Sequence, residues 1–325
     1  MDAQFVYQNL YDLFYMLVFP GLLFLIAFAL FAEYVDRKLH ARLQHRVGPP
    51  WFQPLADVIK LAAKEEMTPR LADRRMFLMA PLVALAATAT AFLYIPTWKS
   101  DIRYHFEGDL ILVLYMLTVP TVTFFLGGWY SRSVYSMIGA ARAVMQLFAY
   151  EVPLFLCILG PALLANTWSI SKMAAFYQVH PAFAALNILG LGVCLVALLG
   201  KLERVPFDIP EAETEIVAGS FTEYSGRLLA MLRLTIDLET IVGAALIAAV
   251  FLPFGLGLPA AAGFAVYLVK LLAVVCVLTV MRSIMARLRI DQMINLCWKV
   301  AAPLGVAQVL IDLVAKGYLP RGYLQ

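Results

Sequence analysis

Long apolar stretches recur along the whole chain, and they constrain its fold more than any other feature of the sequence. Each is close to the ~20 residues that a helix needs to cross a hydrocarbon core of about 30 Å. Within lipid every backbone polar group must be bonded inside the protein, so a helix is the expected form of each stretch. We predict eight transmembrane helices, at about 13–33, 76–97, 109–129, 144–165, 182–202, 233–254, 258–281 and 296–315.

The composition agrees with this fold class. Of the 325 residues, 62% are hydrophobic and only 14% are charged, which excludes an ordinary soluble domain. No linker or internal repeat divides the chain, so we expect an all-α polytopic membrane protein with a single transmembrane domain over residues 1–325. The first span lacks a basic leading region and a small-residue cleavage site, and we expect it to stay in the protein.

The Lys and Arg residues are divided unequally between the two sides of the predicted bundle. With eight spans, 19 lie on one side and 5 on the other, and nine of the 19 fall between residues 33 and 75. The positive-inside rule places the richer side in the cytoplasm and both termini on the non-cytoplasmic side of the cell membrane. We expect the cytoplasmic loops to form one docking face, at about 34–75, 130–143, 203–232 and 282–295.

One segment of this face has helical periodicity. Residues 54–66 predict an amphipathic helix, with Pro54 in its first turn and an apolar stripe made by Leu55, Val58, Ile59 and Ala62. Two interpretations are open: the helix lies on the membrane surface, or it docks against a partner subunit.

Several acidic residues lie where lipid disfavours them. Glu151 falls inside the fourth span, and Asp237 and Glu239 fall just inside the sixth. An ionisable group at membrane depth is a functional candidate, so we expect a partner or a proton path for each. Arg142 lies nine residues before Glu151 and therefore on the opposite helix face, so the partner must come from another helix. Lys270 and Asp312 are similar candidates, unless they reach an interface.

A second group of acids crowds the connection between the fifth and sixth spans: Glu203, Asp208, Glu211, Glu213, Glu215 and Glu223. Pro210 before Glu211 and Glu213 is typical of a helix start. Glu211 and Glu215 would then share a helix face and repel each other, which raises the pKa of at least one carboxyl and suits proton handling. A solvated loop is the alternative interpretation.

The sequence offers little for self-contained catalysis. The four cysteines lie in or beside apolar spans without a CxxC pair, and the four histidines all fall in loops, so neither a metal site nor a haem site is expected. No phosphate-binding loop, dinucleotide fingerprint or nucleophile motif is present at a usable position. The basic residues flank membrane spans, and no nucleic-acid-binding module is evident.

Three motifs run in order along the chain. The first contains Asp36-Arg37-Lys38, Arg42, Arg46-Val-Gly-Pro, Gln53-Pro, Asp57 and Lys60; the second is Gly139-Ala-Ala-Arg142, Gln146 and Tyr150-Glu151-Val-Pro; the third runs from Pro206-Phe-Asp-Ile-Pro-Glu211 to Glu223-Tyr-Ser-Gly. Together they resemble the family of the H subunit of NADH–quinone oxidoreductase, respiratory complex I, and its counterparts in energy-converting membrane-bound hydrogenases. The resemblance covers essentially the whole chain.

The resemblance implies a membrane subunit that docks a hydrophilic redox module and links electron transfer to proton or sodium translocation. It implies iron–sulfur and nickel–iron-hydrogenase-like partner chains, and antiporter-like membrane subunits beside it. By the resemblance, acids of an ion path would be Glu151, Glu203, Glu211, Glu213, Glu215 and Glu223, and a docking or chamber-floor region would comprise Arg37, Arg42, Arg46, Gln53, Asp57 and Lys60. To the ion path we add Asp237 and Glu239 for their depth in the sixth span, and to the docking region Lys38 and Arg142.

Two departures from complex I members favour the hydrogenase or ferredoxin-linked branch. The Gly-Pro stretch at 48–54 is short, and Thr235-Ile-Asp237 stands where respiratory members often carry Ala-Glu-Tyr. Both bear on quinone, which is the cofactor that the complex I branch would use; we expect no other cofactor in this chain alone. A quinone-chamber subunit of complex I remains the alternative, followed by a stand-alone secondary transporter and a passive membrane anchor. The electron donor, the acceptor and the pumped ion depend on partner chains.

Overall fold

The computed structural model describes residues 3–98 and 103–318, and within these two ranges the chain is helical without any β-strand. Its helices are α1 (Ala3–Leu17), α2 (Leu22–Leu43), α3 (Gln53–Ala62), α4 (Arg74–Leu93), α5 (Asp109–Tyr130), α6 (Val134–Ala165), α7 (Ile170–Val179), α8 (Pro181–Leu186), α9 (Ile188–Lys201), α10 (Glu213–Ile216), α11 (Gly226–Phe251), α12 (Ala260–Ile284), α13 (Ile290–Leu296) and α14 (Ala302–Tyr318). A 3-10 turn, η1 (Gly219–Phe221), precedes α11, and a π-helical turn, η2 (Cys297–Ala301), joins α13 to α14.

Seven helical segments of the described chain are long and apolar enough to cross a membrane. They account for seven of the eight predicted spans, with α1 and α2 counted together as one segment, Tyr7–Leu43. The remaining prediction, 182–202, corresponds to α8 and α9, of which α9 is an apolar helix of 14 residues. The prediction of an all-helical polytopic membrane protein is therefore supported.

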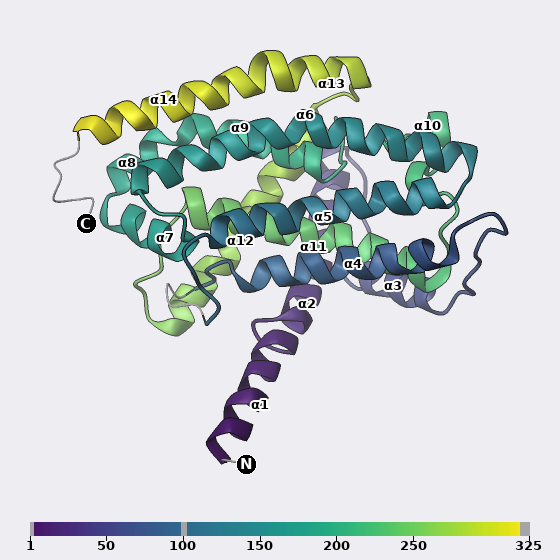
Figure 1. The fold of residues 1–325 in the computed structure, drawn as a ribbon, viewed down its shortest axis with the longest axis horizontal. Coiled ribbons are helices and arrows are strands. Elements are labelled where there is room, and N and C mark those ends of the chain that lie inside the picture. Colours follow the sequence, from purple (N-terminus) through teal and green to yellow (C-terminus); the bar gives the residue numbers. More distant parts are fainter. Residues whose placement is uncertain (1–2, 99–102, 319–325) are drawn as a thin grey trace.

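The helices form one elongated bundle, as Figure 1 shows. Helix α11 is the most deeply buried of the candidate spans in the described chain, and it packs against α2, α4 and α12. Helices α4, α5, α6 and α9 follow one another side by side, and α14 packs across α6 and α9 (Figure 1). Helix α1 stands away from the body and leaves apolar side chains such as Leu10, Leu13 and Phe14 exposed.

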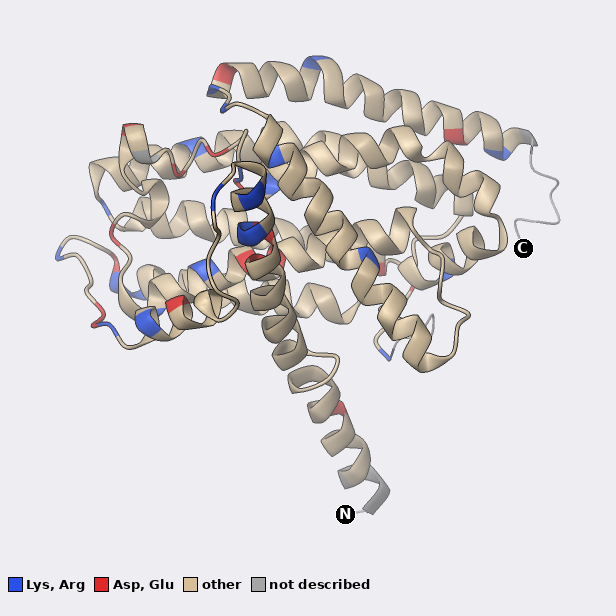
Figure 2. Ribbon diagram, turned by 180° about the vertical axis from the view of Figure 1, so that it is seen from behind, with Lys and Arg blue, Asp and Glu red and all other residues tan. Residues whose placement is uncertain are grey.

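The basic residues gather at the end of the bundle where α3 and α10 lie (Figure 2). The opposite end carries α7, α8 and the connection between α11 and α12 (Figure 1). The division of charge predicted from the sequence is therefore a division between the two ends of the folded bundle.

Helices extend into two of the predicted loops, 130–143 and 203–232. Helix α6 begins at Val134, so most of the 130–143 loop belongs to it, and α11 begins at Gly226 inside the predicted 203–232 loop. The error arises because hydropathy marks where side chains become polar, whereas helical hydrogen bonding continues past that point. Polar side chains of the extended part of α6 find partners in the bundle: Ser136 donates to the Ser220 carbonyl at 3.0 Å.

The amphipathic helix predicted at 54–66 is present as α3, but it ends at Ala62. Beyond it the backbone N–H of Met67 donates to Ser225 Oγ at 3.0 Å, so this segment is bonded to the start of α11 rather than to its own helix. Leu55 and Ile59 of the predicted stripe are exposed, by 48% and 59%. The apolar side of α3 therefore points away from the body of the protein.

Candidate functional site

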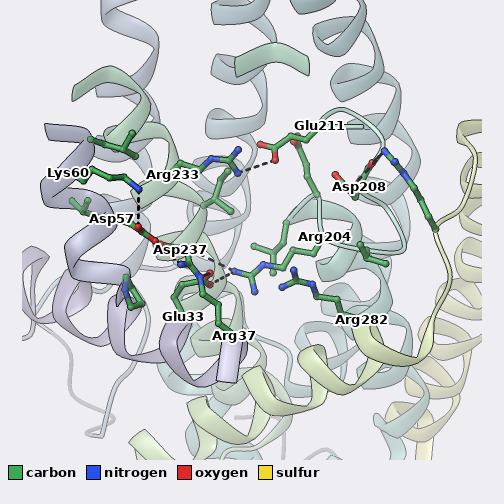
Figure 3. A pocket seen from close by; sticks show the side chains of 18 of the residues that line it. Glu33, Arg37, Asp57, Lys60, Arg204, Asp208, Glu211, Arg233, Asp237 and Arg282 are labelled. Carbon is green, nitrogen blue, oxygen red and sulfur yellow. Dashed lines mark hydrogen bonds and ion pairs between the residues drawn. The ribbon is translucent and has the colours of Figure 1, made fainter. Parts of the chain in front are cut away.

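A polar cavity of about 570 Å³ opens at the basic end of the bundle. Figure 3 shows charged side chains that converge on it from α2, α3, α11, α12 and the segment between α9 and α10. Its charged lining comprises six acids and six bases: Glu33, Asp57, Glu203, Asp208, Glu211 and Asp237, with Arg37, Lys60, Arg204, Arg233, Arg282 and Arg287.

Arg204 is the centre of the ionic contacts in this cavity (Figure 3). Its Nη1 donates to Asp36 Oδ2 at 2.6 Å, its Nη2 donates to Glu33 Oε2 at 2.9 Å, and Asp237 Oδ1 lies 4.0 Å from Nη2. Burial disfavours the charge of the guanidinium, but Asp36 and Glu33 outweigh this effect, and the pKa of Arg204 is raised. One arginine thus joins α2 to α11.

Asp36 is buried beneath this cluster, with 2% of its surface exposed. Besides Arg204 it accepts from Arg282 Nη1 at 2.8 Å and from Thr279 Oγ1 at 2.6 Å, both on α12. A buried carboxylate with two guanidinium partners and a hydroxyl donor is compensated in the way that burial of a charge requires.

Helix α3 is tied to the same cluster through Asp57. This carboxylate accepts from Arg37 Nη1 at 2.9 Å, and from Lys60 Nζ and Gln53 Nε2 at 3.1 Å each. Arg37 also donates to Glu33 at 2.7 Å, so the bonds run without a break from α3 into α2. Partial burial raises the pKa of Asp57, but its hydrogen bonds to Arg37, Lys60 and Gln53 prevail and lower it.

The opposite wall is formed by the segment between α9 and α10. Glu211 accepts from Arg233 Nη1 at 3.0 Å, and Arg287 lies 3.9 Å from Asp208 (Figure 3). Glu203 differs from both, because both of its carboxyl oxygens are buried and find no hydrogen-bond partner in the described part of the chain.

Two further observations set Glu203 apart. Burial, followed by the nearby charge of Glu211 and then of Glu239, raises its pKa well above the usual range of a glutamate. Its backbone has a φ of 50°, a left-handed conformation that non-glycine residues rarely adopt. Strained backbone of this kind is found preferentially at functional sites. Glu203 is therefore a buried cavity carboxyl without a hydrogen-bond donor among the described residues.

A second ionic contact lies deeper in the bundle. Lys201 Nζ donates to Glu239 Oε1 at 2.8 Å, and each of the two side chains is only 1% exposed. Lys201 also donates to the Leu117 carbonyl and is the charged neighbour of Glu151. Among the described residues no hydrogen bond or ion pair of Glu151 is found, so Lys201 of α9 acts on it through its charge alone.

The acids predicted for an ion path therefore fall into separate groups. Asp237, Glu211 and Glu203 line the cavity, Glu239 forms the inner contact with Lys201, and Glu151 lies within electrostatic range of that lysine. Glu223 is half-buried and does not line the cavity, and the side chain of Glu213 lies outside the described part of the structure.

The predicted repulsion between Glu211 and Glu215 is wrong. Glu211 precedes α10 rather than sharing a helix with Glu215, and the two acids have separate arginine partners. Glu215 is exposed and accepts from Arg142 at 2.6 Å, which lowers its pKa instead of raising it. Glu211 is therefore paired with an arginine of α11, and Glu215 with an arginine of α6.

The predicted docking residues are also divided. Arg37, Asp57 and Lys60 line the cavity, and Gln53 bonds to Asp57. Arg42 and Arg46 are exposed and Lys38 is half-buried, without lining the cavity. Arg142 borders a separate surface pocket of about 360 Å³ together with Glu215 and Arg289.

Five charged residues at the centre of the site were not identified as site residues from the sequence: Glu33, Asp36, Lys201, Arg204 and Arg282. The three bases enter the sequence analysis only through the count of cytoplasmic charges, and Asp36 only as part of the first motif. One signal was available in the spacing of Glu33 and Arg37. Oppositely charged residues four apart on a helix can form an ion pair, and the structure contains this pair. The contacts of Arg204 join residues 168 and 171 positions apart and had no local signal.

Lys270 has a structural explanation. Its ammonium group donates to the carbonyls of Leu252 and Phe254 at 3.0 and 2.9 Å, directly after the last turn of α11. Carbonyls at a helix end lack intrahelical donors, and a lysine is a suitable one.

Comparison with known proteins gives concordant results. The profile of the NADH dehydrogenase family matches residues 15–313. The H subunit of the NADH-quinone oxidoreductase of Carboxydothermus hydrogenoformans is 33% identical over 96% of this chain and 92% of its own length. The same subunit of Syntrophotalea carbinolica is 34% identical over 91% of this chain and 92% of its own length.

A solved structure is similar over most of the fold. A chain of the membrane-bound sulfane sulfur reductase, an archaeal respiratory membrane complex, superimposes with a TM-score of 0.80 at 26% identity. The match covers 89% of this chain and 96% of that one.

Proposed function

Because this chain belongs to the NADH dehydrogenase family, as a relative of the H subunit of NADH-quinone oxidoreductase, we propose that it couples a redox reaction to ion movement within a complex I-related membrane oxidoreductase. Its place as a membrane subunit of such a complex follows from the family and from the apolar helices. The coupling role is the step that the site supports.

The observation that carries this proposal is a series of charged side chains in two parts. Ion pairs run from Asp57 through Arg37 and Glu33 to Arg204. Glu203, next to Arg204 in the chain, lines the same cavity and lies within electrostatic range of Glu239, which is bonded to Lys201. A change of charge at the cavity would change the free energy of protonating Glu203. Protonation of Glu203 would in turn change the electrostatic field at the Lys201–Glu239 pair.

The basic end of the bundle is the side we assign to the redox module. The positive-inside rule places this end in the cytoplasm. The exposed apolar residues Trp51, Phe52, Leu55 and Ile59 of α3 and the preceding turn lie there without cover in the described structure. Exposed aromatic and aliphatic groups rimmed by charge are typical of protein interfaces, so they favour docking of α3 against a partner subunit.

Eight membrane crossings complete this topology. Helices α8 and α9 span residues 181–201 with a single break at Asn187, and as one segment they would measure about 30 Å. An even number of crossings leaves both termini on the non-cytoplasmic side of the cytoplasmic membrane.

We favour the hydrogenase or ferredoxin-linked branch of the family over the quinone-reducing one. A cavity wall with twelve charged side chains is poorly suited to an apolar quinone tail, since ligand pockets for apolar molecules are lined mainly by apolar side chains. The sulfane sulfur reductase also provides a relative that is not named for quinone. Quinone reduction is the second candidate, favoured by the name of the curated relatives.

The experiment that tests the coupling role substitutes the proton-accepting groups in the assembled complex. Glu203→Gln and Glu239→Gln should retain electron transfer and lose most ion translocation, measured in the same proteoliposomes. The matched control is Glu107→Gln, which removes an exposed carboxylate paired with Lys172. Unchanged translocation in both variants would instead establish a passive anchor.

Two further measurements separate the alternatives. Co-purification of nickel–iron and iron–sulfur chains with antiporter-like subunits would support the favoured branch, whereas flavin and NADH-binding chains would support the complex I alternative. If the purified chain alone moves a solute in liposomes, both branches are wrong and the protein is a stand-alone transporter.

A further inference from the structure

A buried carboxyl of α14 has no role in the series of charges described above. Asp312 is 0% exposed. Its Oδ2 accepts a hydrogen bond from Gln308 Nε2 at 2.9 Å, and its Oδ1 is buried without a hydrogen-bond partner. No cation of the described chain forms an ion pair with it. Lys316 lies one turn further along α14, but its ammonium group donates to Asn166.

The hydrogen bonds around Asp312 are short of donors. The side-chain amide of Gln308 has two N–H groups, yet three acceptors lie within bonding distance of its nitrogen. They are the Leu186 carbonyl at 3.2 Å, Asn187 Oδ1 at 3.0 Å and Asp312 Oδ2 at 2.9 Å. With Oδ1 of Asp312 as a fourth acceptor, the cluster needs at least one more hydrogen, and a proton on the carboxyl would supply it.

The surrounding helices are shaped around this carboxyl. A Cβ atom at Gly160 of α6 would lie 2.3 Å from Asp312 Oδ2, so only glycine leaves room for the carboxyl there. The backbone N–H of Gly190 in α9 donates to Gln308 Oε1 at 3.1 Å. Helices α6, α9 and α14 are therefore joined at one polar point inside an otherwise apolar interface.

The facing groups offer no compensating charge. Gly160 and Pro161 of α6 and Gly190 of α9 cannot titrate. Tyr177 of α7 is the nearby titratable group, and its hydroxyl donates to the Pro161 carbonyl at 2.8 Å. An ionised carboxylate in such surroundings would be a buried and uncompensated charge, which is far more costly than the neutral acid.

We propose that Asp312 is a proton-binding site of the folded protein, and that the neutral carboxyl joins α14 to α6 and α9. The site is separate from the cavity and from the Lys201–Glu239 pair, and it goes beyond the proposed coupling function. Loss of the proton would place an anion in the interface and weaken the attachment of α14.

Infrared difference spectroscopy of the intact complex tests this proposal. Wild type minus Asp312→Asn at about pH 5, where an ordinary aspartate is ionised, should show the C=O stretch of one protonated carboxylic acid per complex and no loss of carboxylate bands. The matched control is Asp291→Asn at the start of α13, where the aspartate is exposed and carboxylate bands should be lost. Loss of carboxylate bands in Asp312→Asn would overturn the proposal.

Assembly of the variants decides the remaining case. Asparagine has the shape and the polarity of a neutral aspartic acid, so Asp312→Asn should assemble with the yield of the wild type. If Asp312→Asn fails to assemble while Asp312→Glu succeeds, the interface requires a negative charge and the proposal is wrong. This outcome would leave the coupling role of Glu203 and Glu239 untouched, since that role is measured by ion translocation.

Discussion

Asp36 and Asp312 are two aspartates with nearly the same burial and opposite surroundings. Asp36, in the cavity region, receives hydrogen bonds from two arginines and a threonine. Asp312, in the α14 interface, receives one from an uncharged amide. Residue type and burial are therefore insufficient to assign the ionisation state of a carboxyl. The donors that other helices bring to it decide whether it is held as an anion or as a neutral acid.

The largest effect should come from removing Arg204, because Asp36 and Glu33 each lose one of their two arginine partners. We expect Arg204→Ala to destabilise the subunit by about 3–5 kcal/mol, the cost typical of breaking a buried ion pair. Thermal unfolding of the purified complex measures it. A change no greater than that of Arg142→Ala, which breaks an exposed pair, would mean that the cavity charges are solvated.

The inner pair should respond in a different way. Lys201→Met leaves Glu239 buried alone and should cost about 3 kcal/mol, whereas Lys201→Met with Glu239→Leu should recover most of the loss, since an apolar pair can replace a buried ion pair. The readouts are stability and ion translocation. Stability should recover in the double variant, but translocation should not; recovery of both would show that this pair has only a structural role.

A smaller effect is expected in the α14 interface. Gly160→Ala places a methyl group against Asp312 and should destabilise the interface by about 1–3 kcal/mol, as overpacking usually does. Gly192→Ala in α9 is the control, because a Cβ there meets nothing within 4 Å. In the double variant Gly160→Ala with Asp312→Ala, the shorter side chain at position 312 leaves room for the new methyl group. This variant should therefore recover the part of the stability loss that is due to steric overlap. Equal melting temperatures of the two glycine variants would contradict the close packing.

The pH dependence of stability should distinguish Glu203 from its paired neighbours. Since burial and Glu211 raise the pKa of Glu203, the folded state favours the protonated acid, and stability should fall as pH rises through that pKa. One such group changes stability by at most about 1.4 kcal/mol per pH unit. The melting temperature of the Glu203→Gln variant should not show this fall with rising pH. If the variant and the wild type have identical pH profiles, Glu203 is not the titrating group.

The smallest effect is expected at the surface. Glu215→Gln removes the partner of Arg142 at an exposed position, where solvent and salt screen the interaction. Neither the melting temperature nor ion translocation should change measurably. A strong loss of translocation would move Glu215 from the surface into the ion path.

Much of the architecture was predictable because hydropathy is a property of local sequence. Seven of eight spans, the amphipathic helix after residue 53 and the concentration of charge at one end all follow from counting apolar and basic residues. The boundaries were less accurate, as the early start of α6 at Val134 shows, because polar side chains can stay helical when the bundle provides partners.

The sequence by itself determined a polytopic helical membrane protein, its family and a set of acids at unusual depth. Only the tertiary structure decided which of those acids have a cationic partner. Glu215 has Arg142 and Asp36 has Arg204, while Glu203 and Asp312 have no hydrogen-bonded cation within the described ranges. The physical reason is that electrostatic compensation requires charges within a few ångströms of each other in space. The residues that meet at such distances here are far apart along the chain.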